Sequence, residues 1–501
     1  MDADYYYALG MQIATGEGFS EPFLWNYLDD PITLPHPSHL YWMPLASILA
    51  AAAMVVVGST DYWAARIPFI LLSGLIPIIS ASLAMFLLKE KKYAWLAGLL
   101  GVFSGLYVIY LSIPETFVLY LVLGGMFWLI IFTTDWKNTA IRSLFQTAGL
   151  LGILAGMMHL SRADGILWAC AGGVWLIWVV WQRPLNAKLR IAIIGIGIFV
   201  LGYALIMGGW YARNLDLFGS IMPPGNNRTL WITDYNQTFS YPADQLTMSK
   251  WLEAGMAVHL NAWWSAIQMN LKNLVAVQGA IILFPLMLAG LWVNRSKPAV
   301  KFAAIFWLVN FFVMTFVFPY AGARGGFLHS ASAFQCLLWA AAAAGLEQFI
   351  AWGVRKRNWN SEKATPRFAA LLVVICALLT GWFYLVKVYG TGEIETRWGS
   401  NYVTYESILE GMKSYSVDEE TVFMVNNPPG FFIATGHSSI VIPGGGTEQV
   451  LAAAARYGAN YMILEEDQEN LIDLFNTPQD IGSLQYVAEI SGAKLFCFDC
   501  K

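Results

Sequence analysis

Charged residues are scarce in this sequence. Only 12% of its 501 residues are Asp, Glu, Lys or Arg, whereas 57% are hydrophobic. A soluble domain has roughly a quarter of its residues charged, so water cannot be the main solvent of this chain. The net charge of −4 also leaves no basic surface for a phosphate backbone, which excludes a nucleic-acid partner.

Cysteine is also rare, with five residues in the chain. Cys170 and Cys376 lie inside apolar runs, where a thiol behaves as a small buried hydrophobic group. Cys497 and Cys500 form a CxxC motif in a predicted terminal strand, where residues three apart point to opposite faces. We therefore expect structural cysteines and no disulfide or redox centre.

Lys and Arg are absent from residues 1–62, so this segment lacks the basic flank of a signal peptide or of a cytoplasmic terminus. We expect the segment to lie outside the cell, and we expect a further span to precede it. Its apolar stretch 41–58 is interpreted as a juxtamembrane or re-entrant helix, because counting it as a span would place the Lys-Glu-Lys-Lys loop outside.

Long apolar runs are abundant after residue 62. Each is long enough to cross a hydrocarbon core of roughly 30 Å. The ten predicted spans are 63–88, 93–113, 116–132, 145–160, 165–181, 191–207, 274–293, 302–318, 327–352 and 368–386.

Basic residues gather in every second loop between these spans. Those loops (89–92, 137–142, 183–190, 295–301 and 355–367) are predicted to be cytoplasmic by the positive-inside rule. The other loops must then face outward. They include the turns near residues 115, 162 and 324, the loop 208–273, and everything after residue 387.

The region after the last span alternates short β-rich runs with helical stretches, which predicts a small α/β domain. The fold class is therefore an α-helical polytopic membrane protein with about ten spans and a small C-terminal extracytoplasmic α/β domain. We divide it into a first outer loop with juxtamembrane helices (1–62), a transmembrane domain (63–388) and the α/β domain (389–501).

Carboxylates on the outer face are the candidate catalytic groups. Asp2 and Asp4 precede a helical stretch, and a carboxylate beside an apolar rim has a raised proton affinity that suits a general base. The alternative is two solvated acids at a frayed terminus. Glu115 opens a span, where it can cap the helix, orient an acceptor or share a divalent cation with the other acids.

A stiff outer turn, Pro-His-Pro-Ser-His-Leu-Tyr, supplies His36, His39 and Tyr41 as candidate binding residues. We expect the histidines to hydrogen-bond a phosphate or sugar. Metal binding is the less favoured alternative, because no third ligand is near in the sequence, and we assign no metal ligands.

Arginines at outer turns run against the positive-inside rule. Arg162, Arg213 and Arg324 each offer a planar fork of donors that suits a phosphate at the membrane surface. The alternative for each is a pairing with a neighbouring acid, such as Asp164 beside Arg162.

These residues resemble the GT-C superfamily of membrane glycosyltransferases, especially its protein O-mannosyltransferase and aminoarabinose transferase branch. Met-Asp-Ala-Asp-Tyr-Tyr resembles the branch's Asp-Glu and Tyr motif, with Asp2 at the catalytic Asp and Ala3 in place of the second acid. The turn at His36 resembles its His/Lys-Pro-Pro element, and Arg162-Ala163-Asp164-Gly165 resembles its Arg-Pro-Glu-Gly turn. The element around Arg213 resembles its Arg-Asn and Phe-Gly motif.

The resemblance implies an enzyme of the cell membrane whose active site is extracytoplasmic. Such an enzyme moves a sugar from a polyprenyl-phosphate donor to an acceptor hydroxyl on a lipid, glycan or protein. Asp2 or Asp4 would be the base, and the arginines would hold the lipid phosphate. No cofactor is required by the sequence, although a divalent cation could be shared by the outer acids.

Two other classes compete with this enzyme. A transporter would place ionisable residues near the midplane, but the predicted spans are nearly free of charge. A membrane-anchored binding or assembly protein would work through the outer α/β domain.

Overall fold

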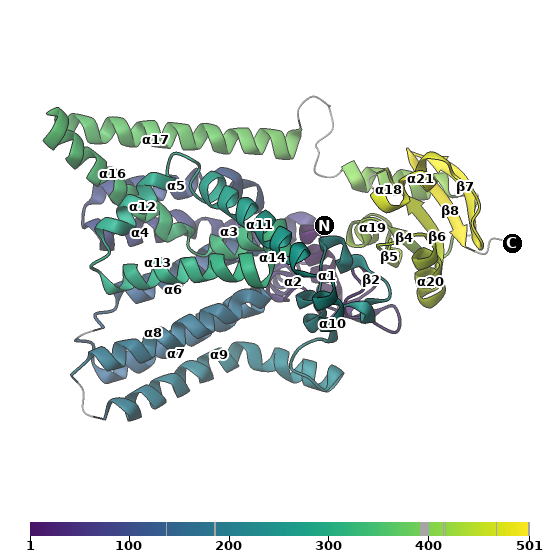
Figure 1. The fold of residues 1–501 in the computed structure, drawn as a ribbon, viewed down its shortest axis with the longest axis horizontal. Helices are drawn as coiled ribbons and strands as arrows, with labels where there is room; N and C mark the ends of the chain where they lie inside the picture. The colour runs from purple at the N-terminus through teal and green to yellow at the C-terminus, as the bar shows by residue number, and fades with distance from the viewer. Residues whose placement is uncertain are drawn as a thin grey trace.

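The computed structural model describes residues 1–136, 138–184, 187–390, 400–413, 415, 417–466 and 468–498. Figure 1 shows a bundle of long helices with a small α/β domain at one end, the end at which the chain begins.

Within these described ranges, eight helical segments are long and apolar enough to cross a membrane. This finding confirms the prediction of a polytopic α-helical membrane protein. The segments are α3 with α4 (Tyr62–Ser73 and Leu75–Leu88), α6 (Thr116–Thr133), α7 (Ile141–Ser161), η2 with α8 (Ala163–Gly165 and Ile166–Gln182), α9 (Lys188–Phe218), α13 with η7 (Pro298–Phe312 and Val313–Val317), α16 (Gln335–Arg357) and α17 with η9 (Ser361–Tyr384 and Leu385–Tyr389).

Two of the ten predicted spans are broken into shorter pieces. The span predicted at 93–113 is α5 (Lys91–Val102) followed by η1 (Gly105–Tyr110), and Gly105 has a φ of 64°, which a right-handed helix cannot continue. The span predicted at 274–293 is η6 (Asn273–Gln278) and α12 (Phe284–Val293), and positive φ angles at residues 280 and 281 separate the two. A hydropathy profile measures the length of an apolar run, so it does not detect where the helix is interrupted.

The basic loops share one end of the bundle, opposite the α/β domain (Figure 1). Lys297 donates a hydrogen bond to the Leu87 carbonyl at 2.6 Å, and Arg183 donates one to the Thr139 carbonyl. The first bond joins the loop 295–301 to the end of α4, next to the loop 89–92, and the second joins the loops 183–190 and 137–142. The loops predicted to be cytoplasmic therefore connect helix ends that lie on the same side of the bundle.

The first segment packs against the bundle through α1 (Asp2–Thr15) and α2 (Leu45–Val57). The 13 residues of α2 make a helix of about 20 Å, too short to cross a bilayer core. The two helices meet closely at Gly10, where an added Cβ would lie 3.1 Å from the Ala50 side chain. Between them, β1 (Ser20–Glu21) pairs antiparallel with β3 (His36–Pro37).

The loop 208–273, which was predicted to face outward, is mostly helical rather than irregular. α9 extends into it as far as Phe218. The elements that follow are η3 (Pro224–Leu230), η4 (Tyr235–Phe239), η5 (Ala243–Gln245), α10 (Met248–Glu253) and α11 (Met256–Lys272). A second group of short helices consists of α14 (Pro319–Ala321), η8 (Gly322–Gly326) and α15 (Phe327–Ser332).

The C-terminal region forms the predicted α/β domain around a six-stranded sheet of order β2-β5-β4-β6-β8-β7. Its strands are β4 (Val422–Val425), β5 (Ser439–Val441), β6 (Ala459–Leu464), β7 (Leu484–Ile490) and β8 (Ala493–Phe498). Its helices are α18 (Ser400–Gly411), α19 (Pro428–Thr435), α20 (Thr447–Tyr457), η10 (Glu469–Leu471) and α21 (Ile472–Asn476).

One strand of this sheet comes from the first segment of the chain. β2 (Phe23–Leu24) pairs in parallel with β5, and Tyr27 donates a hydrogen bond to the Val441 carbonyl at 2.5 Å. The α/β domain is therefore joined to the first segment of the chain by main-chain pairing, which the sequence pattern did not reveal.

The expectation of no disulfide is wrong for Cys497, which is disulfide-bonded. The alternation of faces applies only within a strand, and β8 ends at Phe498. Cys500 lies outside the described residues.

Candidate active site

Three side chains from distant parts of the chain meet at the end of the bundle that was predicted to face outward. They are Asp2 at the start of α1, Glu115 before α6, and His329 on α15. One ligand atom from each lies within 4.8 Å of the other two, and the His329 Nδ1 atom is 3.5 Å from Glu115 Oε1. We call these three residues the acid–histidine cluster.

Residues at the start of α6 hold two members of the cluster. Glu115 is the N-cap of α6, and its Oε2 accepts a hydrogen bond from the Phe117 N–H at 2.9 Å. The Thr116 hydroxyl contacts His329 Nδ1 at 3.1 Å, and the His329 ring stacks on Phe117 with centroids 3.8 Å apart. The predicted capping role of Glu115 is therefore present together with the contact to the cluster.

Burial sets the electrostatics of the cluster. Burial and the neighbouring carboxylate raise the pKa of Glu115 above the ordinary carboxyl range, and burial also raises the pKa of Asp2. Burial and the Arg162 charge hold the pKa of His329 well below its usual value, so its ring is neutral. Two carboxylates this close resist ionising together unless a positive charge offsets them.

Arg162 lies near the cluster, and Arg324 lies beside Tyr235. Arg162 donates from Nε to Asp164 at 2.8 Å and sits 5.7 Å above the Tyr120 ring, while its charge acts on all three cluster residues. Within the part of the chain that the structure describes, its terminal nitrogens have no hydrogen-bond partner. The Arg324 guanidinium lies 5.0 Å from the centre of the Tyr235 ring, whose hydroxyl also feels the Asp2 charge.

Arg213 lies away from the cluster. Its guanidinium donates to the Ser38 carbonyl at 2.8 Å and stacks over Trp210 at 4.4 Å. Arg213 therefore stabilises the turn that carries His36 and His39.

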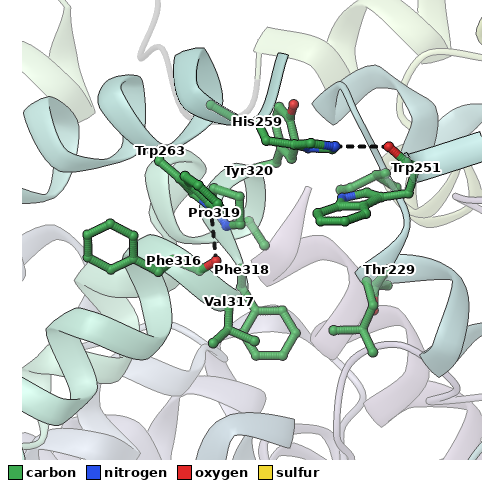
Figure 2. Close-up of a pocket in the computed structure, with 13 residues that line it drawn as sticks. Thr229, Trp251, His259, Trp263, Phe316, Val317, Phe318, Pro319 and Tyr320 are labelled. Atoms are coloured by element: carbon green, nitrogen blue, oxygen red, sulfur yellow. Dashed lines mark hydrogen bonds between the residues drawn. The ribbon is translucent and has the colours of Figure 1, made fainter. Parts of the chain in front are cut away.

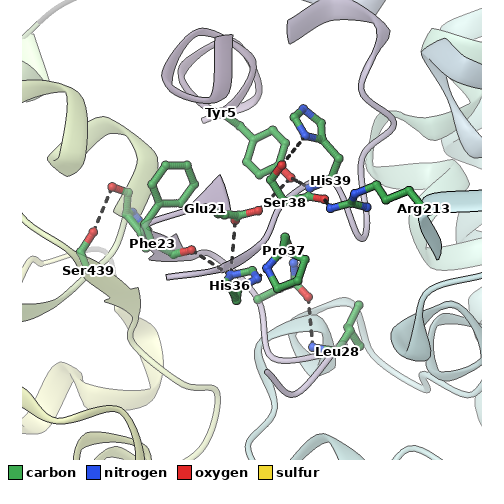
Figure 3. Close-up of polar contacts among 12 residues, drawn as sticks. Tyr5, Glu21, Phe23, Leu28, His36, Pro37, Ser38, His39, Arg213 and Ser439 are labelled. Carbon is green, nitrogen blue, oxygen red and sulfur yellow. Dashed lines mark hydrogen bonds and ion pairs between the residues drawn. The ribbon is translucent and has the colours of Figure 1, made fainter. Parts of the chain in front are cut away.

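Figure 3 shows that turn, in which His36 and His39 are buried in an internal network. The two ring nitrogens of His36 lie 3.1 Å from the Phe23 carbonyl and 2.9 Å from the Pro37 carbonyl, and the one that carries the hydrogen donates to its carbonyl. His39 bonds the hydroxyls of Ser38 and Ser47 at 2.8 and 2.9 Å. Both ring nitrogens of each histidine are thus engaged within the protein.

Two residues of this network were missed by sequence reasoning. The Tyr5 hydroxyl donates to Glu21 Oε2 at 3.1 Å and accepts the His39 N–H at 3.0 Å (Figure 3). Glu21 is 2% exposed, and burial raises its pKa well above the usual carboxyl range. A single acid among aromatic residues and Pro22 was the available signal.

Asp4 faces a different neighbour from Asp2. The Asn427 side-chain amide donates to its Oδ2 at 3.0 Å, and the Tyr402 hydroxyl donates to its Oδ1. Residues two apart on a helix point about 200° apart, so Asp2 can meet the cluster while Asp4 meets the α/β domain.

Tyr41, another predicted binding residue, packs against Trp25 and is affected by the charges of the cluster region. Its ring meets Trp25 edge-on at 5.1 Å, and burial raises its pKa above the usual tyrosine value. The charges of Arg162 and Asp2 both act on its hydroxyl.

His329 was also missed, because it lies beyond the predicted outer turn that ends at Gly326. The signal was present in the composition: the chain has six histidines, and this one follows Arg324 by five residues. Spacing along the sequence could not reveal the cluster, because its members are more than a hundred residues apart.

A small aromatic pocket lies outside the cluster (Figure 2). Trp251 stacks on His259 with centroids 3.9 Å apart, and the Trp263 indole N–H donates to the Phe316 carbonyl at 3.1 Å. Its lining contains no carboxylate, so it carries none of the predicted acid chemistry.

The fold is shared with solved membrane glycosyltransferases. ArnT from Cupriavidus metallidurans bound to undecaprenyl phosphate superposes with a TM-score of 0.60 at 12% identity, over 99% of this chain and 93% of that one. The archaeal oligosaccharyltransferase AglB from Archaeoglobus fulgidus, in complex with an inhibitory peptide and a dolichol-phosphate, gives 0.53 at 13% identity over 93% of this chain. The expected GT-C fold is confirmed.

The chain spans 66% of the length of that archaeal protein. The Archaeoglobus fulgidus oligosaccharyltransferase in complex with Zn and sulfate also matches, with a TM-score of 0.51 at 13% identity over 93% of this chain and 64% of that one. No protein-family model and no curated protein matches the sequence.

Proposed function

We propose that this chain is a glycosyltransferase that moves a sugar from a polyprenyl-phosphate donor to an acceptor hydroxyl on the outer face of the membrane. The observation that carries the proposal is the acid–histidine cluster, assembled beside Arg162 at one end of a GT-C fold. Two of the solved proteins with this fold hold a polyprenyl-type lipid phosphate, undecaprenyl phosphate in one and a dolichol-phosphate in the other.

The outer location follows from charge. α1, which begins with Asp2, lies at the end of the bundle opposite the basic loops (Figure 1), and the positive-inside rule predicts that those loops are cytoplasmic.

Asp2 is the proposed general base. Its carboxylate accepts the proton of the acceptor hydroxyl while the hydroxyl oxygen forms a bond to the anomeric carbon. The bond from that carbon to the donor phosphate oxygen breaks, so a single displacement inverts the anomeric centre. The raised proton affinity of Asp2 suits this role.

Arg162 and Arg324 are the proposed partners of the lipid phosphate. The leaving phosphate departs with its charge, so it needs cationic stabilisation rather than a proton donor. Arg162 still presents two terminal nitrogens after its bond to Asp164. Arg213, His36 and His39 support this site through the turn that they hold rather than through direct contact.

The acid–histidine cluster is also the proposed site for a divalent cation. Two carboxylates and one neutral imidazole are donors that suit Mg²⁺, Mn²⁺ or Zn²⁺. When bound, the cation would allow both carboxylates to stay ionised at neutral pH.

Paired variants test the assignment of the base. In purified protein with a polyprenyl-phosphate sugar, Asp2→Asn should lower kcat by at least about 10²-fold, because the general base is lost. Asp4→Asn should keep measurable transfer. Full activity in Asp2→Asn with none in Asp4→Asn would move the base to Asp4, and full activity in both would refute the mechanism.

A further inference from the structure

The α/β domain is hydrogen-bonded to α1, the helix that carries Asp2. Asp4, in the first turn of α1, has a side chain that is only 17% exposed and accepts hydrogen bonds from Asn427 and Tyr402. Tyr402 belongs to α18, and Asn427 is the N-cap of α19. Two elements of the domain thus converge on one carboxylate of α1.

Asn427 is held in the orientation that this contact requires. Its Oδ1 caps α19 by accepting the Gly430 N–H at 3.4 Å, which turns its Nδ2 toward Asp4. Gly430 makes room for it, because an added Cβ there would lie 2.4 Å from that Nδ2.

Side-chain packing supports the hydrogen bonds between Asp4 and the α/β domain. α19 packs against α1, and the Tyr405 ring of α18 meets Phe431 of α19 at 5.3 Å. The same domain also holds the next part of the first segment, where Phe23 pairs with Ser439 and its ring lies 5.7 Å from Phe432.

We propose that Asp4 is a positioning residue, through which Asn427 and Tyr402 of the α/β domain set the orientation of α1 and so the place of the Asp2 carboxylate. This inference rests on the proposed function of Asp2. Because Asp2 and Asp4 share one rigid turn, a rotation of α1 that frees Asp4 also displaces Asp2 from Glu115 and His329. The domain would then serve catalysis without contacting the reacting atoms.

Exchange of the paired side chains gives the decisive kinetic test. Asn427→Ala and Gly430→Ala should each lower kcat by about 10- to 100-fold while KM for the donor changes little, because the base is displaced but the donor site is intact. The double variant Asp4→Asn with Asn427→Asp restores a donor–acceptor pair with the roles exchanged. It should recover kcat to within about threefold of wild type.

Asn470→Ala is the matched control. Asn470 is another residue of the same domain with a side-chain amide. That amide donates to the Pro443 and Gly445 carbonyls at 3.3 and 2.6 Å, and neither bond involves Asp4. This variant should keep the wild-type kcat. Wild-type kcat in Asn427→Ala and Gly430→Ala, or a folded double variant as slow as its slower parent, would overturn the inference.

Amide hydrogen exchange across α1 provides a measurement that needs no transfer activity. Exchange should be faster in Asn427→Ala, normal in the double variant and normal in Asn470→Ala. Unchanged exchange in Asn427→Ala would overturn the inference even where sugar transfer is confirmed. A wild-type protein without transfer activity would instead refute the proposed function and leave the exchange result to decide the contact.

Discussion

Single residues decide where the chemistry can occur. The sequence offered Asp2 and Asp4 as equivalent candidates, and helical geometry separates them, since one meets Glu115 and His329 and the other meets Asn427. The acids were identifiable because charge is rare in this chain. His329 was not, because only the folded chain brings α15 to the start of α6.

Cation binding at the cluster should depend on pH. Because the pKa values of Asp2 and Glu115 are raised in the folded protein, protons compete with the cation to a higher pH than for ordinary carboxyls. Mn²⁺ affinity, measured by electron paramagnetic resonance, should rise by about tenfold between about pH 6 and pH 8. Glu115→Gln should weaken Mn²⁺ binding. Glu17→Gln, which changes an exposed acid outside the cluster, should not. Equal affinity in all three proteins would exclude this cation site.

Arg162 should be more important than Arg213 for the donor phosphate. Arg162→Gln removes a guanidinium beside the cluster, so KM for the donor should rise by about tenfold or more. Arg213→Gln should instead lower the thermal unfolding temperature, because it removes the bond to the Ser38 carbonyl. The reverse pattern would return Arg213 to the phosphate site.

At the scale of helices and strands, apolar length predicted the existence of most elements and missed their interruptions. The β-rich runs predicted at 421–425, 439–442, 461–464 and 484–490 coincide with β4 to β7, because alternation and flanking turn residues are local signals. The break at Gly105 depends on one φ angle, and the two-residue strand β2 exists only because β5 is there to pair with it. Neither has a local signature.

Helix packing in the bundle depends on glycines at close contacts. An added Cβ at Gly345 of α16 would lie 2.0 Å from the Leu286 carbonyl oxygen of α12, whereas one at Gly381 of α17 meets nothing within 4 Å. Gly345→Ala should therefore lower stability by about 1–3 kcal/mol, seen as a lower thermal unfolding temperature in detergent. Gly381→Ala is the control, and it should be neutral or stabilising. Equal unfolding temperatures would show that α16 and α12 adjust freely.

For the molecule as a whole, charge asymmetry predicted which helix ends lie together, and the fold agrees. The link between the two ends of the sequence was not predictable, since β2 joins the C-terminal sheet over a separation of more than 400 residues. This link and the Asp4 contact make the α/β domain part of the structure around Asp2 rather than an appendage.

The orientation of the bundle is tested by labelling intact cells. In a Cys170→Ser background, Glu17→Cys should react with a membrane-impermeant maleimide from outside. Arg355→Cys should react only after permeabilisation, because the last turn of α16, which carries it, and the residues that follow are rich in basic side chains. The opposite result would move the proposed site to the cytoplasm.

The central claim is that this protein consumes a lipid-linked sugar with Asp2 as the base. Mass spectrometry of polyprenyl-phosphate sugars in cells that lack the gene, complemented with wild type or Asp2→Asn, tests it whatever the identity of the sugar. One lipid-linked sugar should accumulate in the deletion strain and with Asp2→Asn, and should return to its basal level with wild type. A lipid-linked sugar pool that is identical in all of these cells would contradict the account.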